Sequence, residues 1–307
     1  MKTASRNLLT ALLLTSVMAM PIRAQAVMFT WTRLLSGSAS GSWGTQSFWT
    51  GGALPTSTSD GANFSTLDVS TDSTVSLDGN RAINSLSFGD ANATTAANWF
   101  LTPGTPASST LTLGGVSPSI SVSGLASGKS AMIATVIAGT NGLVKSGNGY
   151  LALNAANTYG GTTVLAPSGG NGGISCGHDF SFGTSKVQIG SIVGDSQAWF
   201  QSGGSRTLTN SFEIRTVRWI IDSIQVGTNP AGDLTINGPV SLNQGAVNVR
   251  DIYCLKNLTL GGPMTSTGGL NKNGPAVLTL NGTNTSPGGT TINSGTIRIN
   301  KLLTSID

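Results

Sequence analysis

Along most of the chain, apolar and polar residues alternate over short runs, and glycine or asparagine separates one run from the next. Residues 74–77, 186–189 and 257–260 are typical of these runs. Alternation with a period of two places every second side chain on the same face, so each run predicts a short, half-buried strand. Residues 219–224 form the one continuous apolar run and predict a strand buried on both faces. No amphipathic helix is predicted beyond residue 26.

One longer pattern occurs twice. Residues 142–164 read GLVKSGNGYLALNAANTYGGTTV, and residues 269–292 read GLNKNGPAVLTLNGTNTSPGGTTI. In each copy a glycine turn leads into an alternating strand, a corner rich in Asn, Thr and Gly follows, and a β-branched strand closes the unit. Two such strands are too few to bury a core alone, whereas stacked units form a continuous core. The repetition therefore predicts a solenoid.

This pattern resembles the autotransporter-associated β-strand repeat, which occurs in bacterial surface and secreted proteins, including autotransporter passengers. The resemblance implies an all-β, right-handed parallel β-helix. The first copy matches almost throughout, whereas the second has Ala276 at a turn glycine and Ser286-Pro287 in place of the tyrosine. Residues 295–300 are similar to the strand that closes such a unit, so the second copy extends over 269–299. No known catalytic role accompanies the resemblance.

The mature chain divides into two predicted regions. Residues 27–140 contain four of the six tryptophans and no clear repeat. Because a solenoid needs an end that shields its first rung, this region is predicted to be a β-rich cap with early rungs. Residues 141–307 are predicted to be the β-helix itself, with the repeats at 142–164 and 269–299.

The N-terminus has the three parts of a signal peptide. Lys2 and Arg6 form a basic start, residues 8–20 are apolar, and Ala24 and Ala26 supply the small residues of a cleavage site. The apolar stretch is shorter than the roughly 20 residues that span a bilayer, so cleavage after Ala26 is favoured over an uncleaved anchor. We therefore expect an exported protein, secreted or at the surface or outer membrane of a Gram-negative-type bacterium.

The C-terminal residues show no barrel of amphipathic strands such as an autotransporter would need. The chain is therefore expected either to be a fragment of a larger protein with a further downstream domain, or to depend on another factor for export.

Charge argues against a nucleic-acid partner. Removal of residues 1–26 leaves 13 basic and 12 acidic residues, without a basic cluster. Charged residues make up only 9% of the chain, against roughly 25% in average globular proteins. Disordered chains combine high charge with few apolar residues, whereas 38% of this chain is hydrophobic and alternates. The composition therefore favours a long β structure.

Candidate chemistry is sparse. Cys176, His178 and Asp179 place a thiol, an imidazole and a carboxylate side by side, but working nucleophile–base pairs usually come from distant positions. A surface turn is the favoured interpretation. A bridge between Cys176 and Cys254 is an open alternative, although a solenoid would place them several rungs apart, and two partly buried thiols are favoured. A single histidine and no C-x-x-C spacing predict neither a metal site nor a cofactor.

Two further groups of residues bear on function. Glu213 is the only glutamate and the aspartates are scattered, so an acid pair for polysaccharide cleavage would have to assemble in three dimensions. Trp43 and Trp49 are candidates for a sugar-stacking platform, but packing inside the cap is favoured for both.

The prediction is a non-enzymatic exported rod that presents a surface for adhesion or matrix contact, with polysaccharide or a host surface as its partner. The alternatives are a polysaccharide-active enzyme or a carbohydrate-binding protein on the same scaffold.

Overall fold

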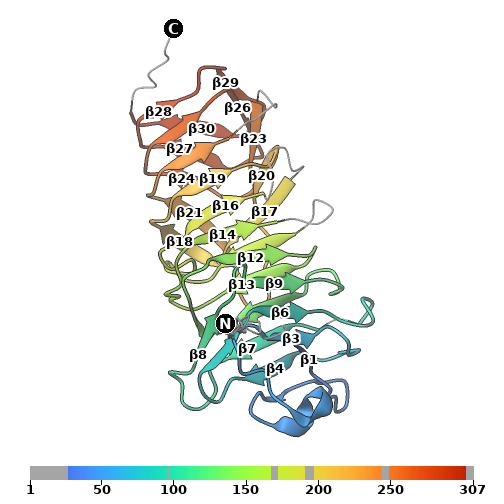
Figure 1. The fold of residues 1–307 in the computed structure, drawn as a ribbon. Helices are drawn as coiled ribbons and strands as arrows, with labels where there is room; N and C mark the ends of the chain where they lie inside the picture. The colour runs from blue at the N-terminus through green and yellow to red at the C-terminus, as the bar shows by residue number, and fades with distance from the viewer. Residues whose placement is uncertain (1–26, 96, 167–171, 191–196, 244–248, 302–307) are drawn as a thin grey trace, which may run out of the picture.

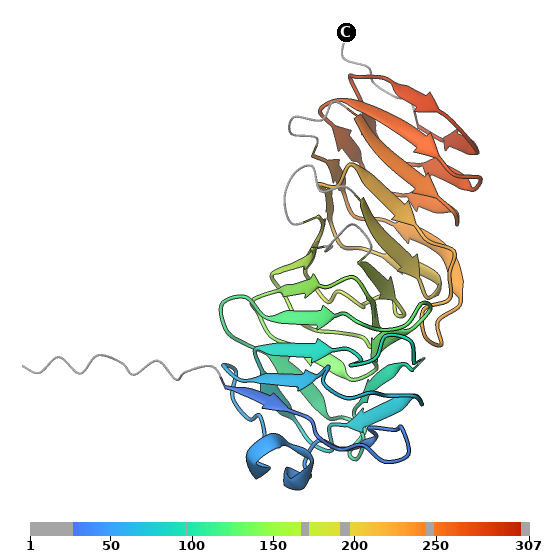
Figure 2. The ribbon, with the colours of Figure 1, turned by 90° about the vertical axis from the view of Figure 1, so that its right-hand side faces the viewer.

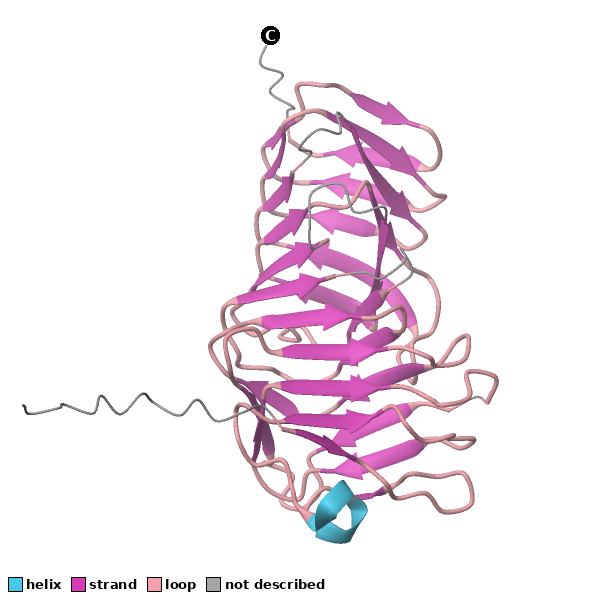
Figure 3. Cartoon of the chain, turned by 45° about the vertical axis from the view of Figure 1, so that its right-hand side comes forward, coloured by secondary structure: helices cyan, strands magenta, loops and turns pink. Residues whose placement is uncertain are grey.

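The computed structural model describes residues 27–301, apart from 96, 167–171, 191–196 and 244–248. The chain winds upward as a solenoid from its N-terminal to its C-terminal end, with strands stacked along the axis (Figures 1 and 3). The prediction of an all-β parallel solenoid is confirmed. Among the described residues, no helix is long and apolar enough to cross a membrane. The predicted cleavage residues Ala24 and Ala26 lie outside the described part.

Each turn crosses three faces in the same order. The first sheet stacks β1 (Met28–Thr30), β3 (Gly61–Phe64), β6 (Ser85–Phe88), β9 (Ser119–Val122), β12 (Leu143–Ser146), β14 (Thr162–Leu165), β16 (Lys186–Ile189), β19 (Phe212–Ile214), β22 (Val240–Leu242), β25 (Met264–Ser266) and β28 (Asn284–Thr285). The second sheet stacks β2 (Gly41–Ser42), β4 (Ser73–Ser76), β7 (Trp99–Thr102), β10 (Ser130–Ile133), β13 (Tyr150–Leu153), β15 (Gly173–Cys176), β17 (Gln197–Ser202), β20 (Arg218–Ile221), β23 (Val249–Cys254), β26 (Gly269–Asn273) and β29 (Thr290–Ile292).

The third face is interrupted. Its lower part contains β5 (Arg81–Ile83), β8 (Thr110–Leu113) and β11 (Val136–Ala138), and its upper part contains β18 (Gly204–Leu208), β21 (Ala231–Ile236), β24 (Leu258–Leu260), β27 (Val277–Leu280) and β30 (Thr296–Ile299). Two short 3-10 helices, η1 (Gln46–Phe48) and η2 (Thr50–Gly52), lie at the N-terminal end, seen as the blue coils in Figure 2.

The length of a turn varies because loops of different size leave the same stack of strands. Val144 pairs with Val164, which is a turn of 20 residues, whereas Ser85 pairs with Ser119, which is a turn of 34. The pairing of β9 with β12 carries the first sheet across residue 140. The division into a cap and a helix at that position stays a prediction.

Inward side chains form columns along the axis because the pairing is parallel and in register. In the first sheet, Leu86, Ile120, Lys145, Leu165 and Ile189 align in this way, and all five are buried. The run at 219–224 is confirmed as a strand buried on both faces over its first half, since the three residues after Arg218 in β20 are all buried. This column is thus apolar apart from one buried lysine, Lys145.

The N-terminal turns are closed by an aromatic cluster. Trp43 and Trp49 are 0% and 2% exposed, and their rings lie 4.9 Å apart between centroids. The indole of Trp49 donates a hydrogen bond to the carbonyl oxygen of Trp43 at 2.8 Å. Both residues therefore pack inside the N-terminal turns, and the hypothesis that they form an outward sugar platform is wrong.

The two repeat copies occupy different faces. The first copy begins with β12 in the first sheet and continues in the second, whereas the second copy begins with β26 in the second sheet and continues with β27 on the third face. The corresponding strands of the two copies are therefore displaced by one face. The motif therefore specifies a strand–turn–strand unit and not a particular side of the solenoid.

In both copies the repeat lysine points inward and caps the glycine turn that follows it. Lys145 Nζ donates to the carbonyl oxygens of Ser146 and Gly147 at 2.9 and 3.0 Å. Lys272 Nζ makes the equivalent bonds to Asn273 and Gly274, both at 2.8 Å. Buried carbonyl oxygens cost free energy when they lack a donor, which explains a lysine at this position.

Candidate functional site

Cys176, His178 and Asp179 do not contact one another through hydrogen bonds; His178 and Asp179 accept from different backbone N–H groups, and Cys176 is buried. The Cys176 thiol is buried inside the second sheet, and burial raises its pKa to about 12. Nδ1 of His178 accepts a hydrogen bond from the N–H of Phe180 at 3.0 Å, and Asp179 accepts one from the N–H of Thr207 at 3.1 Å. Because a thiol with a raised pKa is a weak nucleophile, the cluster stabilises a turn and offers no nucleophile–base pair.

The two cysteines are both free and buried. Cys176 ends β15 and Cys254 ends β23, three rungs further along the second sheet. Rungs are about 4.8 Å apart, so roughly 14 Å separates them, beyond the 7 Å limit for a disulfide. The preference for two thiols over a bridge is confirmed.

Glu213 is the centre of an ion-pair network on the outer face of the first sheet. It accepts hydrogen bonds from Lys186 Nζ, from Arg215 Nε at 2.7 Å and from Asn243 Nδ2 at 3.0 Å. Burial alone would raise the pKa of Glu213, but these donors outweigh it and lower the pKa to about 2. A carboxylate held ionised by three donors is unsuited to proton transfer near neutral pH.

Replacing Glu213 with glutamine should reduce the free energy of unfolding at pH 7 by about 2 kcal/mol. This value is lower than the pKa shift alone would give, because solvent screens the charge of the half-exposed Lys186. The folded pKa lies below the unfolded one, so the stabilisation is present above about pH 4.5 and is lost as pH falls toward 2. Urea denaturation between pH 3 and 7 measures this, and equal losses for wild type and Glu213→Gln on acidification would contradict the assignment.

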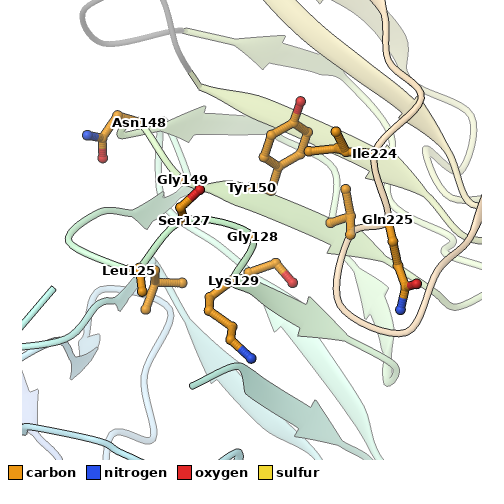
Figure 4. A pocket seen from close by; sticks show the side chains of 12 residues that line it. Leu125, Ser127, Gly128, Lys129, Asn148, Gly149, Tyr150, Ile224 and Gln225 are labelled. Carbon is orange, nitrogen blue, oxygen red and sulfur yellow. The ribbon is translucent and has the colours of Figure 1, made fainter. Parts of the chain in front are cut away.

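The outer face of the second sheet has three adjoining hollows. The first has a volume of about 210 Å³ and is lined by residues of the 125–130, 148–150 and 224–226 segments (Figure 4). The next, of about 250 Å³, shares Tyr150 and Ile224 with the first and adds Trp199. The last, of about 300 Å³, shares Trp199 and continues to Tyr253. Together they form one groove along the solenoid axis, which we call the outer groove.

A column of outward residues forms the apolar floor of the outer groove. The parallel register aligns Tyr150, Gly173, Trp199, Ile220 and Tyr253 on successive rungs. The Tyr150 ring leans over the next rung, since a Cβ on Gly173 would come within 2.2 Å of it. The three aromatic side chains are partly exposed. Glycine and alternation thus combine to bring three separated aromatic rings into one line.

A second, polar column runs beside the first, two residues earlier on each strand. Its members Gln197, Arg218, Asp251 and Asn271 are in register on four rungs. Arg218 Nε lies 3.6 Å from Asp251 Oδ2, and Asn271 Nδ2 donates to Asp251 Oδ1 at 3.1 Å. The Arg218 guanidinium also lies 6.0 Å from the centroid of the Tyr253 ring. These contacts therefore hold the polar side chains in fixed orientations in the absence of a ligand.

Charges in the outer groove balance. Asp222 accepts a hydrogen bond from the Tyr150 hydroxyl, and burial together with this carboxylate raises the pKa of Tyr150, which therefore stays a neutral donor. Arg218 and Asp251 pair with each other. Lys129 lines the first hollow, and Asp222 lines the next. Among the described residues, the groove is thus amphipathic, and its two cations are equal in number to its two carboxylates.

The wall of the outer groove is a strap, residues 222–229, that returns along the sheet by several rungs. Asn229 anchors it by two amide hydrogen bonds with Asn154, at 2.8 and 3.1 Å. Val226 packs in a small apolar cluster with Met132, and Figure 4 shows Ile224 beside the Tyr150 ring. These contacts fix the strap against strands that are far away in the sequence.

Replacing Asn229 with alanine should open the strap. The change leaves the amide of Asn154 without its buried partner, at a cost of about 1–3 kcal/mol. We expect faster amide hydrogen exchange over residues 223–229 with little change elsewhere. The matched control is Gln225→Ala, an exposed residue on the same strap, whose exchange should stay like wild type; equal effects of both changes would contradict this anchoring.

Within the described residues, no cluster of three or more His, Cys, Asp or Glu side chains could hold a metal ion. The carboxylates nearest the outer groove are Asp222 and Asp251. Asp251 is in register with Arg218, and Asp222 lies four residues further along that strand, so about 13 Å separates them. Glycoside hydrolysis uses carboxyl groups roughly 5–9.5 Å apart. Asp222 and Asp251 are therefore too far apart to act as such a pair.

The stacked parallel sheets make the described part of the chain a passenger-like β-solenoid. The passenger-associated-transport-repeat family matches residues 143–166 and 270–299, so the chain carries two autotransporter-associated repeats, as predicted. The adhesin BmaC autotransporter of Brucella suis biovar 1 (strain 1330) is 35% identical over 100 residues, which is 33% of this chain. The match spans about 3% of that relative's length. No solved structure matches this chain.

Proposed function

We propose that this chain is an exported, non-enzymatic solenoid that presents the outer groove to a polysaccharide or a host or matrix surface and so contributes to adhesion. The observation that carries the proposal is the outer groove itself: a line of aromatic rings beside a polar column on a rigid stack of strands. Its location on a repeat-bearing solenoid and the similarity to an adhesin autotransporter support the same function.

The rigid scaffold suits this role. Every strand of the second sheet between β2 and β29 is paired with the strand above and below, so the outward side chains are held at fixed spacing without ligand. Preorganised groups lose little conformational entropy when a partner binds. Export is consistent with the basic, apolar and small-residue segments at the N-terminus, and the surface or outer membrane of a Gram-negative-type bacterium is the proposed location.

The test compares a strain that carries the intact gene with a deletion strain and a complemented one. We expect protease added to whole cells to degrade the protein, and deletion to reduce attachment to immobilised matrix or polysaccharide several-fold. Retention of the protein inside intact cells, or unchanged attachment after deletion, would overturn the proposal. Release of sugar products from polysaccharide by the purified protein would instead support the enzymatic alternative.

A further inference from the structure

The outer groove has a repeating geometry that restricts its ligand. Tyr150, Trp199 and Tyr253 are two rungs apart from each other, with Gly173 and Ile220 on the rungs between them. At about 4.8 Å per rung, the aromatic rings recur at about 10 Å and the three span about 19 Å. This period is comparable with the length of an extended disaccharide unit.

We propose that the outer groove binds one chain of a neutral, extended β-linked polysaccharide, lying along the solenoid axis with sugar rings stacked on Trp199 and Tyr253. The assignment rests on the adhesive role proposed above and names the chemical class of its partner. Tyr150, which leans toward Trp199, extends the same platform by one disaccharide unit.

The aromatic column supplies the stacking surface. A pyranose ring has an apolar face of C–H groups, and an aromatic ring offers a large flat apolar area at little cost in conformational entropy. Trp199 and Tyr253 are both partly exposed at the floor of hollows of about 250 and 300 Å³. Ile220 lies between them and is buried, so its side chain does not project between the two rings.

The polar column supplies hydrogen bonds for hydroxyl groups at the sugar edge. Arg218, Asp251 and Asn271 are held in place by their mutual contacts and offer both donors and acceptors. Arg218 pairs with Asp251, and the described groove residues include as many carboxylates (Asp222 and Asp251) as cations (Lys129 and Arg218). Charge balance therefore favours a neutral chain over an anionic one.

An extended peptide is the competing occupant. Peptides commonly bind sheets by adding a strand to a free edge, and this requires unpaired backbone groups. Along the outer groove the strands from β13 to β26 all have paired neighbours on both sides, so no such edge lies under the ligand. A peptide would also need a row of deep pockets for its side chains, whereas the outer groove offers flat aromatic rings, which favour a sugar chain.

The test uses the purified mature chain on an array of neutral β-linked oligosaccharides of two to six residues, including cello-, xylo- and chito-oligosaccharides. Tetragalacturonate and a random decapeptide library serve as anionic and peptide arms. We expect binding of at least one neutral series, with affinity that rises from the disaccharide to about the tetrasaccharide and then levels, since the platform spans about 19 Å. Silence of all neutral probes, or binding by only the anionic or peptide arm, overturns the assignment.

Variants then locate the site. Trp199→Ala should weaken binding at least tenfold and Tyr253→Ala at least threefold, whereas Trp199→Phe should retain affinity within about threefold because it keeps a flat ring. The matched control is Phe180→Ala, an aromatic that is 55% exposed in the turn after β15 and away from the groove. Circular dichroism and thermal melting confirm that each variant folds. Unchanged binding by Trp199→Ala overturns the site.

Failure of this proposal is distinguishable from failure of the adhesive function. If gene deletion abolishes attachment while the neutral array stays silent, adhesion stands and the glycan assignment fails. If the array binds and deletion leaves attachment unchanged, the groove binds glycan but the adhesive function fails.

Discussion

Replacing Phe64 with alanine should lower the free energy of unfolding of the N-terminal turns by about 3–5 kcal/mol, the usual cost of emptying a buried aromatic site. Phe64 is fully buried, and its ring centroid lies 5.5 Å from that of Trp49, 5.3 Å from Phe88 and 5.6 Å from Trp99. The change therefore removes the centre of the aromatic cluster and leaves several rings without a packing partner.

The effect should be local because a solenoid is stabilised mainly by contacts between neighbouring turns. Hydrogen exchange should accelerate most in β3, β4 and β6 and least in β24 and β27. Tryptophan fluorescence during urea denaturation reports the same turns, since Trp31, Trp43, Trp49 and Trp99 all lie there. Phe180→Ala is the control and should stay within about 0.5 kcal/mol of wild type. A uniform loss of protection along the whole solenoid would contradict the nearest-neighbour picture.

The strands and the stacking were predictable from the sequence because they depend on local pattern. Alternation identified strands such as 186–189 and 257–260 within one residue of β16 and β24. The repeated motif predicted that these strands stack as a solenoid. The face that each copy occupies was not predictable, since it depends on which of the intervening turns form a strand on the third face.

The outer groove could not be predicted because its parts are separated by unequal stretches of chain. Tyr150, Trp199 and Tyr253 come together only when the register of β13, β15, β17, β20 and β23 is known. The sequence drew attention to Trp43 and Trp49, which are close together and flanked by glycine, yet their burial rules them out. Alternation within each strand was the available signal, as it marks positions 199 and 253 as outward once 198 and 252 are assigned to the core.

The burial of the repeat lysine also could not be predicted from the sequence. A lysine in a strand is normally expected to face solvent. Lys145, however, is fully buried between Ile120 and Leu165 in the inward column of the first sheet. Its two carbonyl contacts satisfy a neutral amine as well as an ammonium ion, and no described carboxylate forms a salt bridge with it. Burial lowers the pKa of Lys145 to about 7.

Lys145→Met should therefore remove a pH dependence of stability. In the wild type the unfolded chain binds a proton on Lys145 up to about pH 10.5, whereas the folded chain releases it above about pH 7. Between these values the unfolded state holds more protons, so the free energy of unfolding rises with pH by up to about 1.4 kcal/mol per unit. The difference between wild type and Lys145→Met should grow by roughly 2–3 kcal/mol from pH 7 to pH 9.

Urea denaturation at matched pH measures this difference. Comparison at each pH is required because the buried thiols of Cys176 and Cys254, whose pKa values are raised to about 12, weaken folding above about pH 9 in both proteins. Lys272→Met should show the same sign, since burial also lowers the pKa of Lys272. Lys129→Met removes a partly exposed lysine and is the matched control, whose free energy of unfolding should stay within about 0.5 kcal/mol of the wild type. Parallel curves for Lys145→Met and wild type would show that the buried amine stays charged, and that the carbonyls of the glycine turn bind it as an ammonium ion.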